Sequence, residues 1–141
     1  MDYKQKLSQL IELVIAQGAS DLHLSTGVQP VIRVSGSLTP ILAEAKLTPE
    51  DMMGLISELV PPASKEKFLK TQEADFSYAH ANIARFRGNA YFERGNMGVA
   101  LRLIPRQIRT TTELNLPPLL ERFAGKEPGC FLVGGPVGQG K

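Results

Sequence analysis

The amino-acid sequence predicts a small α+β domain that is followed by the first strand of a second, α/β domain. Apolar residues recur at helical spacing near the N-terminus, several later segments alternate apolar and polar residues, and an apolar run near the end leads into a glycine-rich loop. With 141 residues, of which 43% are hydrophobic and 21% charged, the chain has the composition of a soluble globular protein and enough length for one domain with a core.

The first predicted element is an N-terminal helix. Apolar residues between Tyr3 and Ile15 recur every three or four positions, and Gly18 is expected to end the helix. Glu12 and Gln17 interrupt the apolar run, so it is neither the core of a signal peptide nor a membrane span.

Three short strands are predicted next. The segment "SDLHLS" alternates, so its two leucines face one way while Asp21 and His23 face the other. The segment "VIRVSGSLTPIL" has the pattern of two strands that are separated by a turn at Ser35 and Gly36.

Two helices and a three-stranded meander complete the first domain. Thr48 is expected to cap a helix that begins at Pro49 and ends before Pro61, and a shorter helix is expected at about 63–70. The segments "ADFSYAH", "IARFRGNAYFERG" and "MGVALRLI" alternate and predict an antiparallel meander. A further short helix, closed by Gly125, precedes the second domain.

The end of the chain matches the pattern of a phosphate-binding loop. "GPVGQGK" satisfies G-x-x-x-x-G-K, in which backbone N–H groups curl around a phosphate and the lysine reaches the β- and γ-phosphates. The buried strand that must precede such a loop is assigned to "GCFLVGG". The Ser or Thr that would hold Mg²⁺ is expected directly after this sequence. The candidate nucleotide-binding residues are Gly135, Pro136, Val137, Gly138, Gln139, Gly140 and Lys141.

Charge is distributed unevenly along the chain, and arginine accounts for much of this asymmetry. Residues 1–84 carry seven Lys and Arg against ten Asp and Glu, whereas residues 85–141 carry nine against four. Between positions 85 and 109 every basic residue is arginine, whose planar fork suits phosphate or carboxylate. A solvated sheet face is the plainer explanation of the same charges.

The alternation in "RFRGNAYFE" places Arg85 and Arg87 together on the strand face that points away from the core. A two-residue turn at Gly95 and Asn96 would set Arg102 opposite Asn89, on the same face as the other two arginines. We expect a one-residue slip to send Arg102 to the opposite face. Three guanidiniums on one face repel one another unless an anion joins them, so Arg85, Arg87 and Arg102 form a candidate anion-binding set.

Other functional classes fit the sequence less well. "RGNAYFER" loosely matches the aromatic strand of an RNA-recognition fold, but Asn89 and Arg94 stand where aromatic residues are needed, so no nucleic-acid partner is expected.

His23 and His80 lack a ligand at metal-binding spacing, so no metal site is expected within this chain, and a hydrogen bond to Asp21 or an interface contact is expected for His23. The single cysteine, Cys130, excludes an internal disulfide and fits a reducing compartment.

Three stretches together resemble the PilT family, the type IV pilus retraction motors within the larger group of secretion ATPases. They are "GASDLHLSTGVQPVIRVSGSLTPI", "ARFRGNAYFERGNMGVALRLIP" and "ELNLPPLLERFAGKEPGCFLVGGPVGQGK", which cover most of the chain in the family's order. The resemblance implies a PAS-like N-terminal domain over 1–106, an interdomain linker with a short helix over 107–128, and the truncated start of a RecA-like ATPase domain over 129–141.

The resemblance also implies a function. Such proteins look like hexameric rings that use ATP and Mg²⁺, retract pili for twitching motility, and work with a pilus platform protein at the inner face of the cell membrane. In this picture the chain is cytoplasmic and peripheral, it has no integral membrane segment, and Arg85, Arg87 and Arg102 reach the phosphates. The Mg²⁺ ligand and the acidic and histidine boxes of the family would lie beyond Lys141, so this chain alone is not expected to hydrolyse ATP.

Departures from the family pattern keep alternatives open. The family loop carries Thr, Thr and Ser where this chain has Gly134, Val137 and Gln139, although the backbone cradle is intact. One alternative is an accessory homologue of the PilU kind or another secretion ATPase homologue. A second alternative is a stand-alone PAS-like binding or assembly module without ATPase activity.

Overall fold

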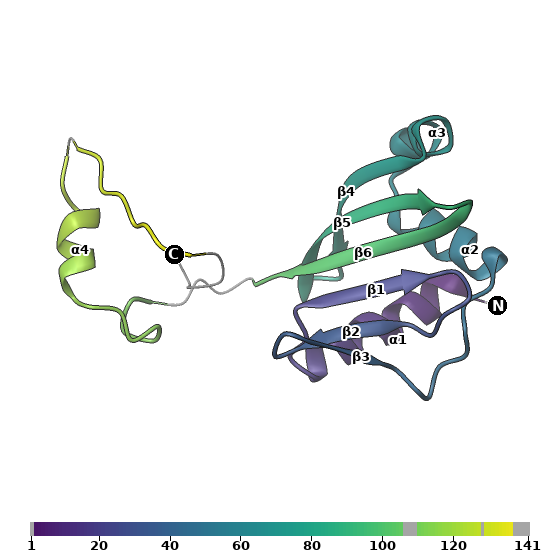
Figure 1. Cartoon of the computed structure of the whole chain (residues 1–141), viewed down its shortest axis with the longest axis horizontal. Helices are drawn as coiled ribbons and strands as arrows, with labels where there is room; N and C mark the ends of the chain where they lie inside the picture. Colours follow the sequence, from purple (N-terminus) through teal and green to yellow (C-terminus); the bar gives the residue numbers. More distant parts are fainter. Residues whose placement is uncertain (1, 106–109, 128, 137–141) are drawn as a thin grey trace. The chain divides into compact units, whose positions relative to one another are not determined.

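The computed structural model describes residues 2–105, 110–127 and 129–136, and the chain divides into two units, Met1–Arg106 and Gln107–Lys141. The first unit is built on a six-stranded antiparallel sheet with the order β3-β2-β1-β6-β5-β4 (Figure 1). The strands are β1 (Asp21–Ser25), β2 (Val31–Val34), β3 (Ser37–Pro40), β4 (Glu73–His80), β5 (Ala84–Glu93) and β6 (Asn96–Ile104). The predicted α+β class is therefore confirmed, and β1 joins the first three strands to the meander through β6.

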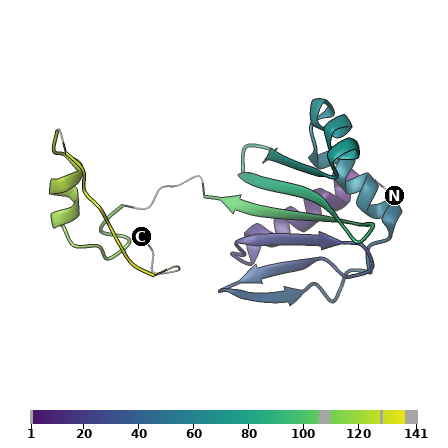
Figure 2. The same ribbon diagram turned by 45° about the horizontal axis from the view of Figure 1, so that its top comes forward.

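Helices cover one face of this sheet and leave the other open. Their bounds are α1 (Tyr3–Ala16), α2 (Pro49–Leu59) and α3 (Pro62–Thr71). Figure 2 shows α1 and α2 behind the strands, with α3 beside β4. Within residues 2–105 no helix lies on the opposite face, where exposed polar side chains such as those of Arg85 and Arg87 meet solvent.

The helix boundaries follow from local chemistry and agree with the sequence prediction to within one or two residues. Asp2 caps α1 by accepting a hydrogen bond from the backbone N–H of Gln5. At α2, Thr48 and Asp51 form a reciprocal capping box, and Pro49 occupies the first helical turn. These contacts satisfy backbone N–H groups that have no partner within the helix.

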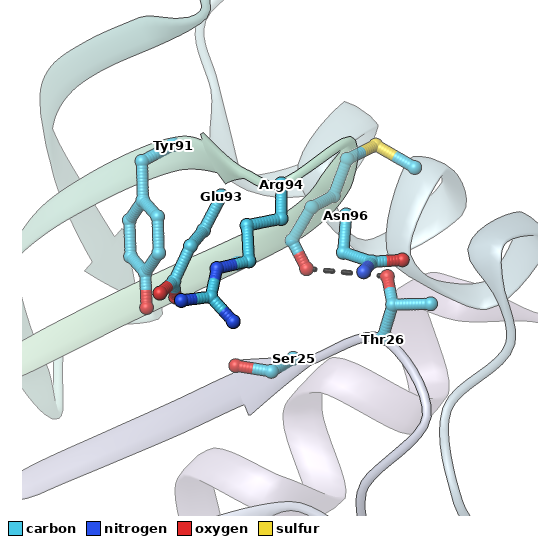
Figure 3. A pocket seen from close by; sticks show the side chains of 8 residues that line it. Ser25, Thr26, Tyr91, Glu93, Arg94 and Asn96 are labelled. Atoms are coloured by element: carbon cyan, nitrogen blue, oxygen red, sulfur yellow. Dashed lines mark hydrogen bonds between the residues drawn. The ribbon is translucent and has the colours of Figure 1, made fainter.

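The turn between β5 and β6 differs from the predicted one. Arg94 and Gly95, rather than Gly95 and Asn96, form the two-residue loop (Figure 3). Both have positive φ, 51° for Arg94 and 81° for Gly95, which is the conformation that a type I′ turn requires. The glycine adopts this conformation at no steric cost, whereas the arginine does so under strain.

The register of the hairpin is consequently shifted. Arg102 lies directly opposite Arg87, and Asn89 lies opposite Ala100, so the predicted pairing of Arg102 with Asn89 was wrong. Arg102 nevertheless stays on the predicted face. Moving a two-residue turn by one position changes the pairing by two residues, which preserves the face of every side chain. The expectation that such a slip would turn Arg102 over was therefore also wrong.

Replacing Arg94 by asparagine is expected to raise the free energy of unfolding by up to about 1 kcal/mol, because asparagine tolerates the left-handed conformation better than arginine. Urea unfolding should show a higher midpoint with an unchanged slope. Arg94→Ala is the matched control, since it removes the same side chain but keeps the backbone strain. An equal gain in both variants would contradict the conformational explanation.

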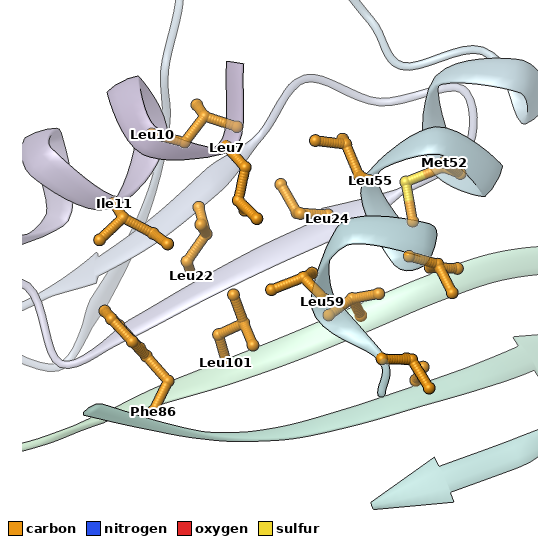
Figure 4. Packing of buried hydrophobic residues seen from close by; sticks show 14 of the residues in the cluster. Leu7, Leu10, Ile11, Leu22, Leu24, Met52, Leu55, Leu59, Phe86 and Leu101 are labelled. Atoms are coloured by element: carbon orange, nitrogen blue, oxygen red, sulfur yellow. The ribbon is translucent and has the colours of Figure 1, made fainter. Parts of the chain in front are cut away.

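The core lies between the helices and the covered face of the sheet. Figure 4 shows labelled side chains of α1, α2, β1, β5 and β6 converging there. Fully buried members include Leu7, Leu10, Ile11, Leu22, Leu24, Met52, Leu55, Phe86 and Leu101. The strand leucines are those predicted to face inward, and the helix residues repeat at the spacing that identified α1.

The second unit contains α4 (Leu119–Ala124), with Gly125 at its C-cap as predicted. The predicted buried strand that leads to the glycine loop is wrong for the described residues: 129–136 form no strand, and Leu132 is 87% exposed. A strand is stable only when neighbours satisfy its backbone groups, and no strand lies beside this segment within 110–127 or 129–136. In the described parts of the chain, no helix combines the length and apolar character needed to cross a membrane.

Candidate functional site

Four charged side chains form a row across the open face of the sheet. Arg33 of β2 lies opposite Asp21 of β1, Asp21 lies opposite Arg102 of β6, and Arg102 lies opposite Arg87 of β5. Antiparallel partners that face each other share one side of the sheet, so all four point to the open face. We call these four residues the arginine row.

Asp21 is the fixed centre of the arginine row. Only 5% of the residue is exposed, although it lies on the open face. Its carboxylate accepts hydrogen bonds from Ser20 Oγ at 2.7 Å and from Arg102 Nε at 2.9 Å, and Arg33 Nε lies 3.3 Å away. Burial opposes ionisation, but the hydrogen bonds from Ser20 and Arg102 hold the pKa of Asp21 below its ordinary value.

The three arginines of the row differ in how many of their guanidinium nitrogens are already bound. Arg33 is engaged on both sides, because its Nη1 also donates to the carbonyl of Gly36 at 3.0 Å. Arg102 uses only Nε, and 75% of its side chain is exposed. Arg87 is exposed and has no ion pair or hydrogen bond from its side chain to another residue within 2–105. Arg87 and Arg102 therefore present unused guanidinium nitrogens side by side.

These two arginines line a shallow depression of about 270 Å³ on the open face. Its wall also includes His23, Asn89 and Asp75. Asn89 Nδ2 donates a hydrogen bond to an oxygen of Asp75 at 3.4 Å, and within residues 2–105 Asp75 forms no ion pair with Arg87 or Arg102. The depression is open and most of its lining residues are charged or polar, which suits a charged group that arrives from solvent rather than an enclosed apolar ligand.

The structure brings together two of the three predicted arginines. Arg87 and Arg102 are direct cross-strand neighbours, whereas Arg85 lies two residues along β5, opposite Ile104 and outside the wall of the depression. Of the predicted loop residues, Gly135 and Pro136 lie in the second unit. Val137, Gly138, Gln139, Gly140 and Lys141 lie outside the described residues.

His23 is placed beside Asp21 as predicted, but the predicted His–Asp hydrogen bond is not formed. The Nε2 atom of His23 is buried and has no hydrogen-bond partner among the described residues. Burial lowers the pKa of His23; Asp21 opposes this effect, and Arg33 and Arg102 reinforce it. No group of three or more His, Cys, Asp or Glu side chains suited to a metal ion occurs among the residues that the structure describes.

The stability of the first unit is expected to decrease as the pH falls below about 6.5, the ordinary pKa of histidine. The lowered pKa means that the unfolded chain binds a proton at His23 before the folded chain does, so the stabilisation is present above that pH and lost below it. Urea unfolding between pH 7.5 and 5 measures this slope. His23→Gln should flatten it and His80→Gln should retain it; an unchanged slope in His23→Gln would contradict the assignment.

Sequence reasoning missed a second hollow, of about 180 Å³, at the β5–β6 turn. Figure 3 shows Arg94 reaching over it toward Ser25, with Tyr91 and Asn96 at its sides. The hollow depends on the position of the turn, and the sequence pattern placed that turn one residue too late. The dipeptide "RG" was the available signal, because a glycine at the second position of a hairpin loop favours a type I′ turn.

Comparison with known proteins gives consistent matches, although no family model matches the chain. The chain is 35% identical over 135 residues to the type IV pilus retraction ATPase PilT of Pseudomonas aeruginosa, and this match covers 96% of the chain and 39% of that relative. It is 30% identical over 136 residues to the type IV pilus ATPase PilU of the same organism, with 96% and 35% covered. A crystal structure of the pilus retraction motor PilT with bound ADP superposes with a TM-score of 0.74 at 30% identity, over 84% of this chain and 35% of that one. The chain thus spans little more than a third of the length of the curated relatives that it matches.

Proposed function

We propose that this chain, over the portion that it spans, belongs to the PilT family of secretion ATPases and forms the N-terminal part of an ATP-driven motor that retracts type IV pili. The observation that carries this proposal is the pair of unused guanidiniums on the open sheet face, in a chain that also ends in the pattern of a phosphate-binding loop. The identity to PilT and the bound ADP of its solved structure support nucleotide as the ligand.

The donor set suits a polyphosphate. Guanidinium groups bind phosphate oxygens with pairs of parallel hydrogen bonds, and Arg87 has no carboxylate partner within residues 2–105 that would compete. Arg102 keeps its terminal nitrogens available because only its Nε is bound to Asp21. Both side chains therefore have the charge and the free donors that contact with β- and γ-phosphate oxygens requires.

In this proposal the chain's own residues stabilise charge rather than make or break bonds. Bound ATP, with Mg²⁺, supplies the phosphoanhydride bond whose hydrolysis drives movement. Arg87 and Arg102 place positive charge where negative charge accumulates as the γ-phosphate leaves, and Arg85 approaches from the next row of the sheet. Backbone N–H groups between Gly135 and Gly140, except at Pro136, would cradle the phosphates, and Lys141 would contact the β- and γ-phosphates.

The assembly that this function requires is also part of the proposal. The motor is a homo-hexamer that acts on a pilus platform protein and lies peripherally at the inner face of the membrane. In a ring, arginines of one domain can contact a nucleotide that another domain holds. The proposal needs such an assembly, because neither the arginines nor the phosphate-binding loop is sufficient for hydrolysis alone.

Hydrolysis of ATP by the intact protein that contains this chain tests the proposal. Phosphate release should depend on Mg²⁺ and should be abolished in Lys141→Ala, and a Ser or Thr should follow Lys141 in the intact sequence. An intact protein that folds, forms no ring and hydrolyses no ATP would favour the stand-alone binding module. An intact protein that hydrolyses ATP only together with a second motor would favour the accessory role of PilU, the relative at 30% identity.

A further inference from the structure

We propose that Asp21 is a positioning residue that holds Arg102 with its terminal nitrogens directed at the phosphate site. The inference deepens the proposed function and rests on it, since it assigns the group that orients one of the phosphate-contacting arginines. Two partners in the arginine row differ in solvent exposure: Asp21 is 5% exposed, whereas 75% of the side chain of Arg102 is exposed. A buried carboxylate that binds an exposed guanidinium fixes the base of that side chain and leaves its tip in solvent.

The contacts of Asp21 explain how the guanidinium is fixed. One carboxylate oxygen accepts the hydrogen bond from Arg102 Nε at 2.9 Å, and the other accepts from Ser20 Oγ at 2.7 Å. Arg33 Nε lies 3.3 Å from that second oxygen. Because each oxygen has its own partner, the carboxylate has little freedom to rotate and Arg102 is bound in one orientation.

Arg33 serves this arrangement as an anchor and not as a second ligand-binding arginine. Its guanidinium spans Asp21 and the carbonyl of Gly36, in the turn between β2 and β3. Along the row, Arg33 anchors Asp21, and Asp21 in turn orients Arg102. Arg87, at the end of the row, forms no ion pair within residues 2–105. An isolated arginine on a sheet face loses rotamer freedom when it binds a ligand, and an arginine already held at Nε has lost part of that freedom beforehand.

Electrostatics alone predicts the opposite effect for Asp21, which makes the proposal testable. A carboxylate near Arg87 and Arg102 repels phosphate, so removing it should tighten anion binding if its charge were all that mattered. Positioning predicts weaker binding. Asp75 is the matched control, because it lines the same depression and carries the same charge but is hydrogen-bonded to Asn89 and, within residues 2–105, to no arginine.

The experiment measures binding of inorganic tripolyphosphate to the 141-residue chain at low ionic strength, for the wild type and for Asp21→Ala, Asp75→Ala and Arg102→Gln. Asp21→Ala should weaken binding roughly tenfold, in line with lost preorganisation, and Asp75→Ala should not weaken it. The double variant with Asp21→Ala and Arg102→Gln should bind no more weakly than Arg102→Gln alone. Tighter or equal binding by Asp21→Ala, or a full further loss in the double variant, would overturn the proposal.

A measurement without ligand separates this inference from the proposed function and covers the case that Asp21→Ala does not fold. In the ¹⁵N–¹H spectrum of the wild type, the Arg102 Nε–H signal, assigned by its loss in Arg102→Gln, should exchange with water more slowly than that of Arg87. Equal exchange at the two arginines would overturn the positioning role. A protected Arg102 signal in a chain that does not bind tripolyphosphate would support positioning while removing the phosphate site.

Discussion

Arg87→Gln is expected to lower the ATP turnover of the intact protein by about 100-fold, the typical loss when one preorganised donor to a developing charge is removed. Arg87 is suited to this role because its guanidinium is exposed, lies opposite Arg102, and has no other partner within residues 2–105. The same lack of partners predicts that the free energy of unfolding changes by less than about 0.5 kcal/mol. Phosphate release and urea unfolding, measured on the same preparations, check both parts.

Two variants of other basic residues, Lys70→Gln and Arg102→Gln, serve as comparisons for Arg87→Gln. Lys70→Gln removes an exposed positive charge from α3, outside the wall of the depression, and should leave turnover unchanged. Arg102→Gln should also lower turnover, but with some loss of stability, because Asp21 is buried and would keep only Arg33 and Ser20 as partners. If Arg87→Gln hydrolysed ATP at the wild-type rate, Arg87 would have no role at the phosphates.

Phe86→Ala is expected to lower the free energy of unfolding by about 3–5 kcal/mol, the usual cost of deleting a buried aromatic ring. Phe86 is fully buried, and it lies on β5 between the two arginines of the "RFR" motif, with Leu103 opposite it on β6. Since small domains are stable by only about 5–15 kcal/mol, this single change removes a large part of the total.

Chemical denaturation of the 141-residue chain measures this effect. Ser77→Ala is a suitable control, because Ser77 is exposed on the neighbouring strand β4, opposite Arg87, and its removal should change stability by less than about 0.5 kcal/mol. A loss smaller than about 1 kcal/mol in Phe86→Ala would mean that the core does not depend on this ring. Because Phe86 lies between Arg85 and Arg87, the variant should also disturb the arginine row, which is why function is tested with surface variants instead.

The sequence predicted the elements of the first unit well because each has a local cause. The apolar spacing of α1, the capping box at Thr48 and the alternation in β5 depend on near neighbours alone. The shared face of Arg85 and Arg87 was also predicted correctly, since the side-chain period of a strand does not depend on its partner. Arg102 was predicted on the correct face although its turn was misplaced, because moving a two-residue turn by one position shifts the pairing by two residues.

What the sequence could not provide is the pairing between distant strands. Asp21 meets both Arg33 and Arg102 only because β1 pairs with both β2 and β6, and a separation of 81 residues between Asp21 and Arg102 leaves no local signal. The turn at Arg94 was misplaced because the left-handed conformation of an arginine is unfavourable locally and is imposed by the hairpin register. The strand predicted before the glycine loop needs neighbours that the described residues do not supply.

The central claim is that the arginine row faces the phosphates of a bound nucleotide, and a structure of the intact protein with a non-hydrolysable ATP analogue tests it most directly. The account predicts terminal nitrogens of Arg87 and Arg102 within about 2.7–3.1 Å of phosphate oxygens, with Arg102 Nε still bound to Asp21. A structure in which the nucleotide is bound while both guanidiniums contact only solvent or protein would contradict it.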